Sequence, residues 1–208
     1  VTTTDKEDAR IFELDSAMLE GLWSQGARRD PPKEGLALDL DERGCRAGSA
    51  AKPAPLPDLL HGGFTADLAL RLEDLRPGQT VIDCRTEGGH GWALTTAEGG
   101  TLEIVLDDGR NRPERWATDP GLLHAGREHR VTFIIDGGPN LILALVDGRL
   151  CDGGESGDRG WGRFSRRVMA LGEKPAAPRV GQGRGVRMTR LRLYDRPLRV
   201  SEAAALAR

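Results

Sequence analysis

The sequence predicts an all-β fold in which two antiparallel sheets pack face to face and a short helix follows the last strand. From residue 64 onward, apolar and polar residues alternate in short segments that recur about every ten residues. Glycine-rich or Asp-Gly turns separate these segments, as expected for antiparallel hairpins. Strands and helices do not alternate along this part, so the pattern disfavours a parallel α/β sheet.

The individual strands follow from the spacing of apolar residues. Residues 64–72 carry an apolar side chain at nearly every second position, which predicts a strand with one buried face. Four further strands are expected at residues 80–86, 92–96, 101–107 and 114–118. The second and third of these form a hairpin around Glu98-Gly99-Gly100.

The strongest hairpin joins residues 130–136 to residues 141–147, and Asp147-Gly148 then turns the chain into a further short segment. In the last strand, residues 186–194, the apolar positions shift by one residue, which predicts a β-bulge at Thr189-Arg190. Ser201 is expected to cap a short helix over residues 202–207, with Glu202 in its first turn.

The first sixty residues are less regular, and the whole chain, residues 1–208, is interpreted as one domain. Residues 1–10 have the composition of a linker or a processed end, as expected of a piece cut from a longer protein. Residues 11–63 are expected to hold strands at 11–14 and 36–40, a helical turn at 16–23 and an irregular crossing.

Composition limits the classes of partner and cofactor. The net charge of -2 does not favour nucleic acid, and no apolar run approaches the ~20 residues of a membrane span. Three cysteines, Cys45, Cys84 and Cys151, allow either one disulfide with a free thiol or three buried thiols. The histidines are scattered without zinc spacing, so they are expected to be structural or exposed.

Three segments of the chain have distinctive strand-and-turn sequences: HRVTFIIDG at 129–137, LALVDG at 143–148, and MTRLRLYDRPL at 188–198 followed by Ser201-Glu202. They resemble the laminin-G-like domains of bacterial extracellular proteins, which belong to the concanavalin-A-like jelly rolls. The resemblance covers residues 64–208 and implies a jelly-roll β-sandwich in a bacterial secreted or cell-surface protein. The chain departs from the family at Arg190, where many members have an acidic residue. This fold carries lectins, glycosidases, lyases and adhesive modules alike.

The candidate ligand-binding residues are two tryptophans with neighbouring arginines. Sugar sites use an aromatic face for stacking and polar groups for the hydroxyls. Trp116 and Trp161 are therefore the candidate platforms, and Arg110, Arg112 and Arg163 are their candidate polar partners. The alternative is that both tryptophans plug the ends of the sandwich, while Trp23 and Trp92 are expected in the core.

Acidic residues provide weaker candidates. Asp152, Glu155 and Asp158 in a glycine-rich loop are oxygen ligands suited to a structural calcium ion, or else a solvated loop. Glu103 and Asp107 can share a strand face, but the chain lacks the E-x-D-x-x-E pattern of the glucanases and any other complete catalytic motif.

The sequence therefore favours a non-catalytic accessory module of a larger secreted protein. Its expected partners are a glycan or polysaccharide and the neighbouring domains of the parent protein, with calcium as the one cofactor considered. Two alternatives stay open: a glycoside hydrolase or polysaccharide lyase on the same fold, and a structural or adhesive domain.

Overall fold

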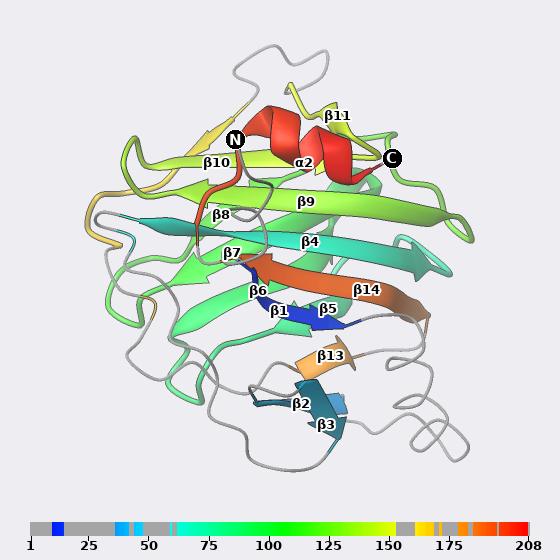
Figure 1. The fold of residues 1–208 in the computed structure, drawn as a ribbon, viewed down its shortest axis with the longest axis horizontal. Helices are drawn as coiled ribbons and strands as arrows, with labels where there is room; N and C mark the ends of the chain where they lie inside the picture. Colours follow the sequence, from blue (N-terminus) through cyan, green and yellow to red (C-terminus); the bar gives the residue numbers. More distant parts are fainter. Residues whose placement is uncertain are drawn as a thin grey trace, which may run out of the picture.

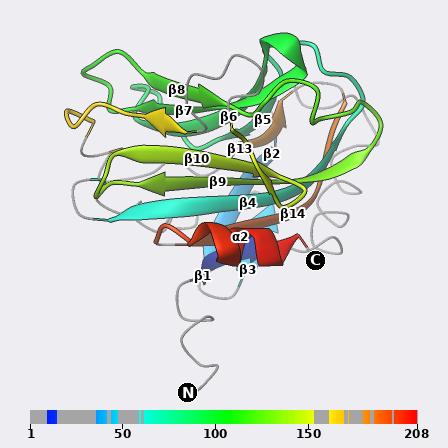
Figure 2. The ribbon, with the colours of Figure 1, turned by 90° about the horizontal axis from the view of Figure 1, so that it is seen from above.

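A computed structural model of the chain describes residues 10–14, 36–41, 44–47, 59, 62–152, 161–168, 171, 179–182, 185–194 and 196–207. Two sheets lie face to face, and one helix lies outside them (Figures 1 and 2). Every strand pairing within these ranges is antiparallel. The predicted all-β sandwich with a short helix near its C-terminal end is confirmed.

Each of the two sheets takes its strands from early, middle and late parts of the chain. The front sheet of Figure 1 contains, in order, β1 (Arg10–Leu14), β14 (Val186–Tyr194), β4 (Gly63–Leu72), β9 (Glu128–Asp136), β10 (Leu141–Val146) and β11 (Arg149–Leu150), with β12 (Gly162–Arg163) also paired to β10. The back sheet contains β3 (Gly44–Ala47), β2 (Leu36–Asp41), β13 (Arg179–Gln182), β5 (Thr80–Asp83), β6 (Gly91–Ala97), β7 (Thr101–Asp107) and β8 (Glu114–Ala117). The back sheet thus combines an early, a middle and a late part of the chain.

The predicted hairpin β9–β10 is confirmed, and the turns before and after β10 use the residue types that left-handed backbone requires. Leu141 pairs with Asp136 and Val146 with Val131. Asn140 has φ 59° and Asp147 has φ 51°, a region that asparagine and aspartate tolerate better than most residues. Gly148 follows Asp147 with φ 80°, so both central residues of that turn are left-handed, as in a type I′ hairpin.

The predicted bulge in the last strand is also confirmed. The register between β14 and β4 shifts between Met188 and Arg190, leaving Thr189 as the extra residue. Met188 and Leu191 are both buried in the core between the sheets, although an unbroken alternation would place them on opposite faces. The bulge therefore reverses which residues of β14 face outward.

The core fills the space between the sheets with apolar side chains from both. Trp92 is 0% exposed, as predicted, and its ring lies 5.4 Å from that of Phe64 across the sandwich. Cys84 and Cys151 are both buried, and no disulfide joins them. The side chains of Cys45 and Trp23, and the predicted helical turn at 16–23, lie outside the described residues.

The sequence predicts an outward face of β4 that is open to solvent, but the first half of this face is covered. Thr65 and Asp67 point away from the core, yet each is 0% exposed. The chain after β14 covers them, because Thr65 Oγ1 donates to the Arg196 carbonyl (3.0 Å) and accepts from the Leu198 N–H (2.9 Å). Alternation along a strand reveals which residues share a face, but not whether another element covers that face.

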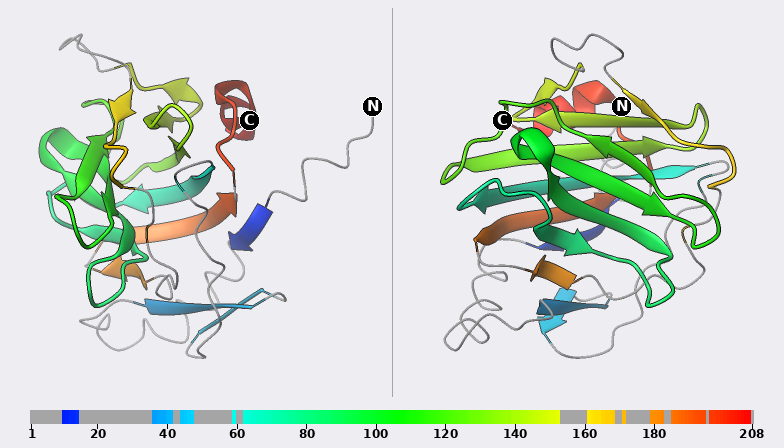
Figure 3. Two further views of the ribbon diagram at one scale, coloured as in Figure 1. Left: turned by 90° about the vertical axis from the view of Figure 1, so that its left-hand side faces the viewer. Right: turned by 180° about the vertical axis from the view of Figure 1, so that it is seen from behind.

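Helix α2 (Val200–Leu206) provides the rest of this cover and lies against the outer side of the front sheet (Figures 2 and 3). Ala203 packs with Ile134 of β9 and Leu145 of β10 in a small second apolar cluster. The helix begins before Ser201, with Arg199 at the N-cap, so the predicted Ser201 cap is wrong. Glu202 lies in the first turn as predicted and accepts the Arg199 N–H (2.8 Å).

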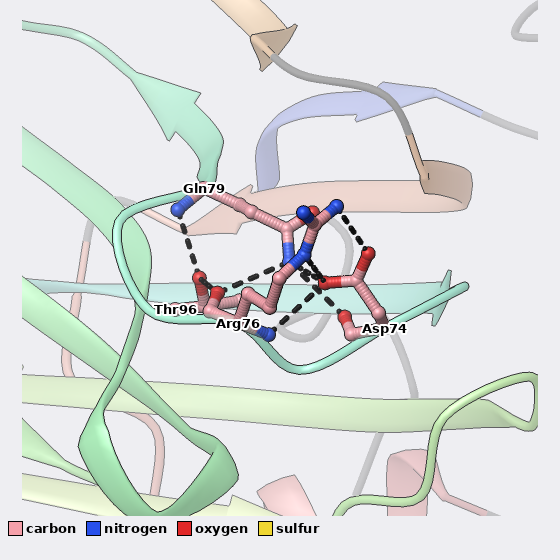
Figure 4. A network of polar contacts seen from close by, with 4 residues as sticks. All are labelled: Asp74, Arg76, Gln79 and Thr96. Carbon is pink, nitrogen blue, oxygen red and sulfur yellow. Dashed lines mark hydrogen bonds and ion pairs between the residues drawn. The ribbon is translucent and has the colours of Figure 1, made fainter.

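Polar contacts attach the loop between β4 and β5 to Thr96, near the end of strand β6 in the back sheet (Figure 4). Asp74 accepts from the guanidinium and N–H of Arg76 and from the Gln79 side chain. Thr96 Oγ1 donates to the Arg76 carbonyl (2.6 Å) and accepts the Gln79 N–H (2.9 Å). These contacts are internal, so this cluster serves the loop's own structure. Among the described residues, no helix is long and apolar enough to cross a membrane.

Candidate functional site

Residues 161–165 bridge the two sheets along one edge of the sandwich. Gly162 and Arg163 pair with Ile142 and Leu141 of the front sheet. Two residues further on, the Ser165 N–H donates to the carboxylate of Glu114, the first residue of β8 in the back sheet (3.1 Å). We call the surface formed by residues 114–117 and 161–165 the tryptophan edge.

Trp116 fills the gap beneath this bridge. Its side chain is partly buried and packs against the main core. A Cβ atom built on Gly162 would lie 2.6 Å from Trp116 Cδ2, which shows that the indole lies directly against the glycine backbone. Trp116 therefore plugs the end of the sandwich, which is one of the two roles expected from the sequence.

Trp161 lies at the same edge but faces solvent. Its exposed fraction is 45%, and within the described part of the chain the only other exposed large hydrophobic side chain is Val200, at 36%. Arg163, two residues further on, is also exposed. The structure thus brings Trp161 and Arg163 beside Trp116, although about 45 residues separate the two tryptophans in the sequence.

Arg110 and Arg112 are exposed in the loop that leads into β8. Asp108 holds this loop by accepting from the N–H groups of Arg110 (3.0 Å) and Asn111 (2.8 Å) and from the Asn111 side-chain amide (2.6 Å). Burial acts to raise the pKa of Asp108, but these hydrogen bonds outweigh it and lower the pKa. Because Glu114 anchors Ser165, the loop with the two arginines adjoins the tryptophan edge.

The acidic candidates are not gathered into a site by the described residues. Asp152 is exposed, and its N–H donates to the Asp119 carboxylate (2.8 Å), while Glu155 and Asp158 lie outside the described ranges. Where the structure is described, no group of three His, Cys, Asp or Glu side chains is arranged to hold a metal ion. Glu103 is paired with Arg115 (2.6 Å), and Asp107 accepts the Gly109 N–H (2.7 Å).

A second surface feature was not predicted from the sequence. A hollow of about 700 Å³ lies on the outer side of the front sheet, beside the last turn of α2. Its wall includes Arg130, Arg190, Arg192, Glu128, Thr189 and Leu206, and we call it the arginine hollow. The sequence does indicate that Arg190 and Arg192 share a strand face after the expected bulge. It does not indicate that α2 lies beside that face, so the hollow could not be predicted.

His129 and Asp147 also line this hollow, yet their geometry is structural. His129 Nε2 accepts the His124 N–H (3.0 Å), so this nitrogen carries no proton. The proton of the neutral ring is then on Nδ1, which donates to the Asp147 carboxylate (2.8 Å). Both ring nitrogens are therefore engaged within the protein, and His129 fits the structural role expected of it.

Comparisons with known proteins support the fold. No protein-family model and no curated protein matches the chain. The resemblance to laminin-G-like domains is therefore not supported by a family match. Solved structures do match, among them the binding domain of botulinum neurotoxin DC in complex with rat synaptotagmin II. That domain has a TM-score of 0.60 and 12% sequence identity, over 96% of this chain and 51% of the other.

Two further matches have the same character. The binding domain of botulinum neurotoxin DC in complex with SialylT has a TM-score of 0.55 and 11% identity, over 83% of this chain and 41% of that one. The binding domain of Paraclostridial Mosquitocidal Protein 1 has a TM-score of 0.56 and 10% identity, over 84% of this chain and 52% of that one. The chain spans about half the length of these domains or less, and at such identities the likeness shows a shared β-sandwich fold.

Proposed function

We propose that this chain is a non-catalytic binding module of a larger secreted protein and that it binds carbohydrate at the tryptophan edge. The observation that carries the proposal is Trp161, a large aromatic side chain left 45% exposed beside an exposed arginine. Exposing an indole costs free energy that burial against a ligand recovers, at roughly 25 cal/mol for each Å² of apolar surface removed from water.

The chemistry of this edge suits a sugar. The face of an indole packs against the C–H groups of a pyranose ring, and the guanidinium of Arg163 can donate hydrogen bonds to its hydroxyls. Trp116 and Gly162 pack together underneath and give Trp161 a rigid base. Arg110 and Arg112, on the adjoining loop, would contact further units of a longer glycan.

Several parts of the proposal come from the resemblance and the comparisons. The similar structures are binding domains, one in complex with SialylT and another with rat synaptotagmin II, which supports a binding role for this fold. The same proposal includes membership of the laminin-G-like family and a secreted or cell-surface location. It also includes a structural calcium ion bound by Asp152, Glu155 and Asp158, and packing against a neighbouring domain of the parent protein.

A glycan array followed by calorimetry on the best ligand tests this proposal. Trp161→Ala should weaken binding at least tenfold. Val200→Ala, which removes the other exposed large hydrophobic side chain of the described residues, should leave the affinity unchanged. Equal binding by Trp161→Ala and the parent chain would remove the tryptophan edge as the site. Absence of binding to every glycan on the array would overturn the carbohydrate function itself.

A further inference from the structure

The arginine hollow lies apart from the tryptophan edge, on the outer side of β14, β4 and β9 and against the end of α2. Helix α2 lies on the outer side of the front sheet near β9 and β10 (Figure 2), and residues of its last turn contribute to the wall of the hollow. The volume of the hollow, about 700 Å³, is within the range of small-molecule sites, roughly 300–1,000 Å³. We propose that this hollow binds an acidic sugar through its carboxylate or sulfate group, held by the guanidinium of Arg190.

The bulge in β14 is what turns these arginines outward. Val186 and Met188 are buried, so unbroken alternation would also direct residues 190 and 192 into the core. The extra residue at Thr189 reverses the alternation, and both arginines line the hollow instead. Bulges are often found where a strand must redirect a side chain toward a site.

The other charged groups of the wall are engaged within the protein. The guanidinium of Arg130 pairs with the buried carboxylate of Asp67 and donates to the Leu206 carbonyl. Asp147 accepts from His129 and from the Arg130 N–H (2.9 Å), and Glu128 accepts from the Thr189 hydroxyl (3.0 Å). The carboxylates of Asp147 and Glu128 thus each accept hydrogen bonds from donors within the protein.

Arg190 differs from these groups. It is partly buried, and its guanidinium makes no hydrogen bond or ion pair with the residues that the structure describes. A guanidinium presents its donors as a planar fork that matches the two oxygens of a carboxylate or sulfate. Because the site is partly enclosed, such a pair is screened less by salt than one on an open surface.

The remaining wall chemistry favours a sugar over a bare anion. The oxygens of Glu128 and Thr189 provide acceptors for hydroxyl groups, and Ala69, Ala205 and Leu206 provide apolar surface. A sugar acid has both kinds of group within the size of one ring. This inference does not depend on the proposed function, because it concerns another surface of the molecule.

Calorimetry with the full chain and three probes, glucuronate, inorganic sulfate and neutral glucose, tests the inference. Glucuronate should bind, sulfate should compete with it, and glucose should not bind. Arg190→Gln should weaken glucuronate at least tenfold, and Arg190→Lys should recover only part of the loss, since lysine keeps the charge but not the planar fork. The matched control is Arg187→Gln, an exposed arginine on the same strand that does not line the hollow.

Each remaining outcome is decisive. Unchanged affinity in Arg190→Gln, or an equal loss in Arg187→Gln, would overturn the assignment. Sulfate binding with no glucuronate binding would overturn the sugar as ligand and leave only an oxyanion site. Thermal melting of each variant shows whether it is folded. Trp161→Ala should keep full glucuronate affinity, so failure at one surface is distinguishable from failure at the other.

Discussion

Glu202 shows how much one side chain contributes to the end of the fold. Its carboxylate accepts from the Arg196 guanidinium (3.0 and 3.2 Å) and from the Arg199 N–H (2.8 Å). The hydrogen bonds from Arg196 are the main reason that the pKa of Glu202 falls from 4.5 to about 2. The negative charge also lies in the first turn of α2, where the helix dipole favours it.

The shifted pKa predicts a pH dependence of stability. Because the folded pKa is lower than the unfolded one, ionised Glu202 stabilises the fold at neutral pH, and this contribution is lost as the pH falls from 4.5 toward 2. Glu202→Gln should therefore lower Tm at neutral pH and narrow the Tm difference between neutral pH and about pH 3. Thermal melting at both pH values measures this. The exposed Glu87→Gln should behave like the parent chain; an unchanged Tm difference in Glu202→Gln would contradict the prediction.

At the scale of elements, an ion pair between Arg130 and the buried Asp67 helps to attach α2 to the front sheet. Asp67 of β4 is 0% exposed and receives hydrogen bonds from Arg130 and from the Thr132 hydroxyl (2.8 Å). The same guanidinium donates to the Leu206 carbonyl in the last turn of the helix. Arg130 thus connects strand β4, strand β9 and helix α2 in one contact set.

Removing Arg130 should leave the Asp67 charge buried without its cation. Loss of one partner of a buried pair costs about 3–5 kcal/mol, so we expect Arg130→Ala to reduce the free energy of unfolding by that amount. Urea denaturation monitored by tryptophan fluorescence measures it. Arg127→Ala, an exposed arginine just before β9, serves as the control and should change the free energy by less than about 0.5 kcal/mol. A similar small change in Arg130→Ala would show that the pair does not support the helix.

At the scale of the whole molecule, both sheets share one core. Cys84, which follows β5 of the back sheet, and Cys151, which follows β11 of the front sheet, are buried in the same apolar cluster. Burial is the main reason that the pKa of Cys151 rises from 9.0 to about 11. A thiol in this state lacks the thiolate that reacts with alkylating reagents.

These two thiols therefore report on the opening of the sandwich. With Cys45 replaced by serine, we expect both to resist iodoacetamide under native conditions and to react together as urea unfolds the protein. Peptide mass spectrometry, which assigns the label to each cysteine, makes the measurement. Fast labelling of one thiol while the other stays protected would contradict a single cooperative core.

Local pattern was enough to predict much of this fold. The hairpin of β9 and β10, the Asp147-Gly148 turn and the bulge at Thr189 were all read from alternation and turn residues over a few positions. Such features depend on neighbours along the chain, so the sequence contains their physical cause. Trp92 in the core follows in the same way from its place on a buried strand face.

The surfaces were decided by contacts between distant residues. Thr65 is covered by Leu198, 133 positions further on, and Trp116 lies against Gly162. Arg190 becomes part of a hollow only because α2 folds back beside the outer side of its sheet. The sequence by itself determined which residues alternate along each strand and where the strands turn. The tertiary structure decided which faces are covered and which side chains share a site, because these depend on how the sheets and the helix pack in space.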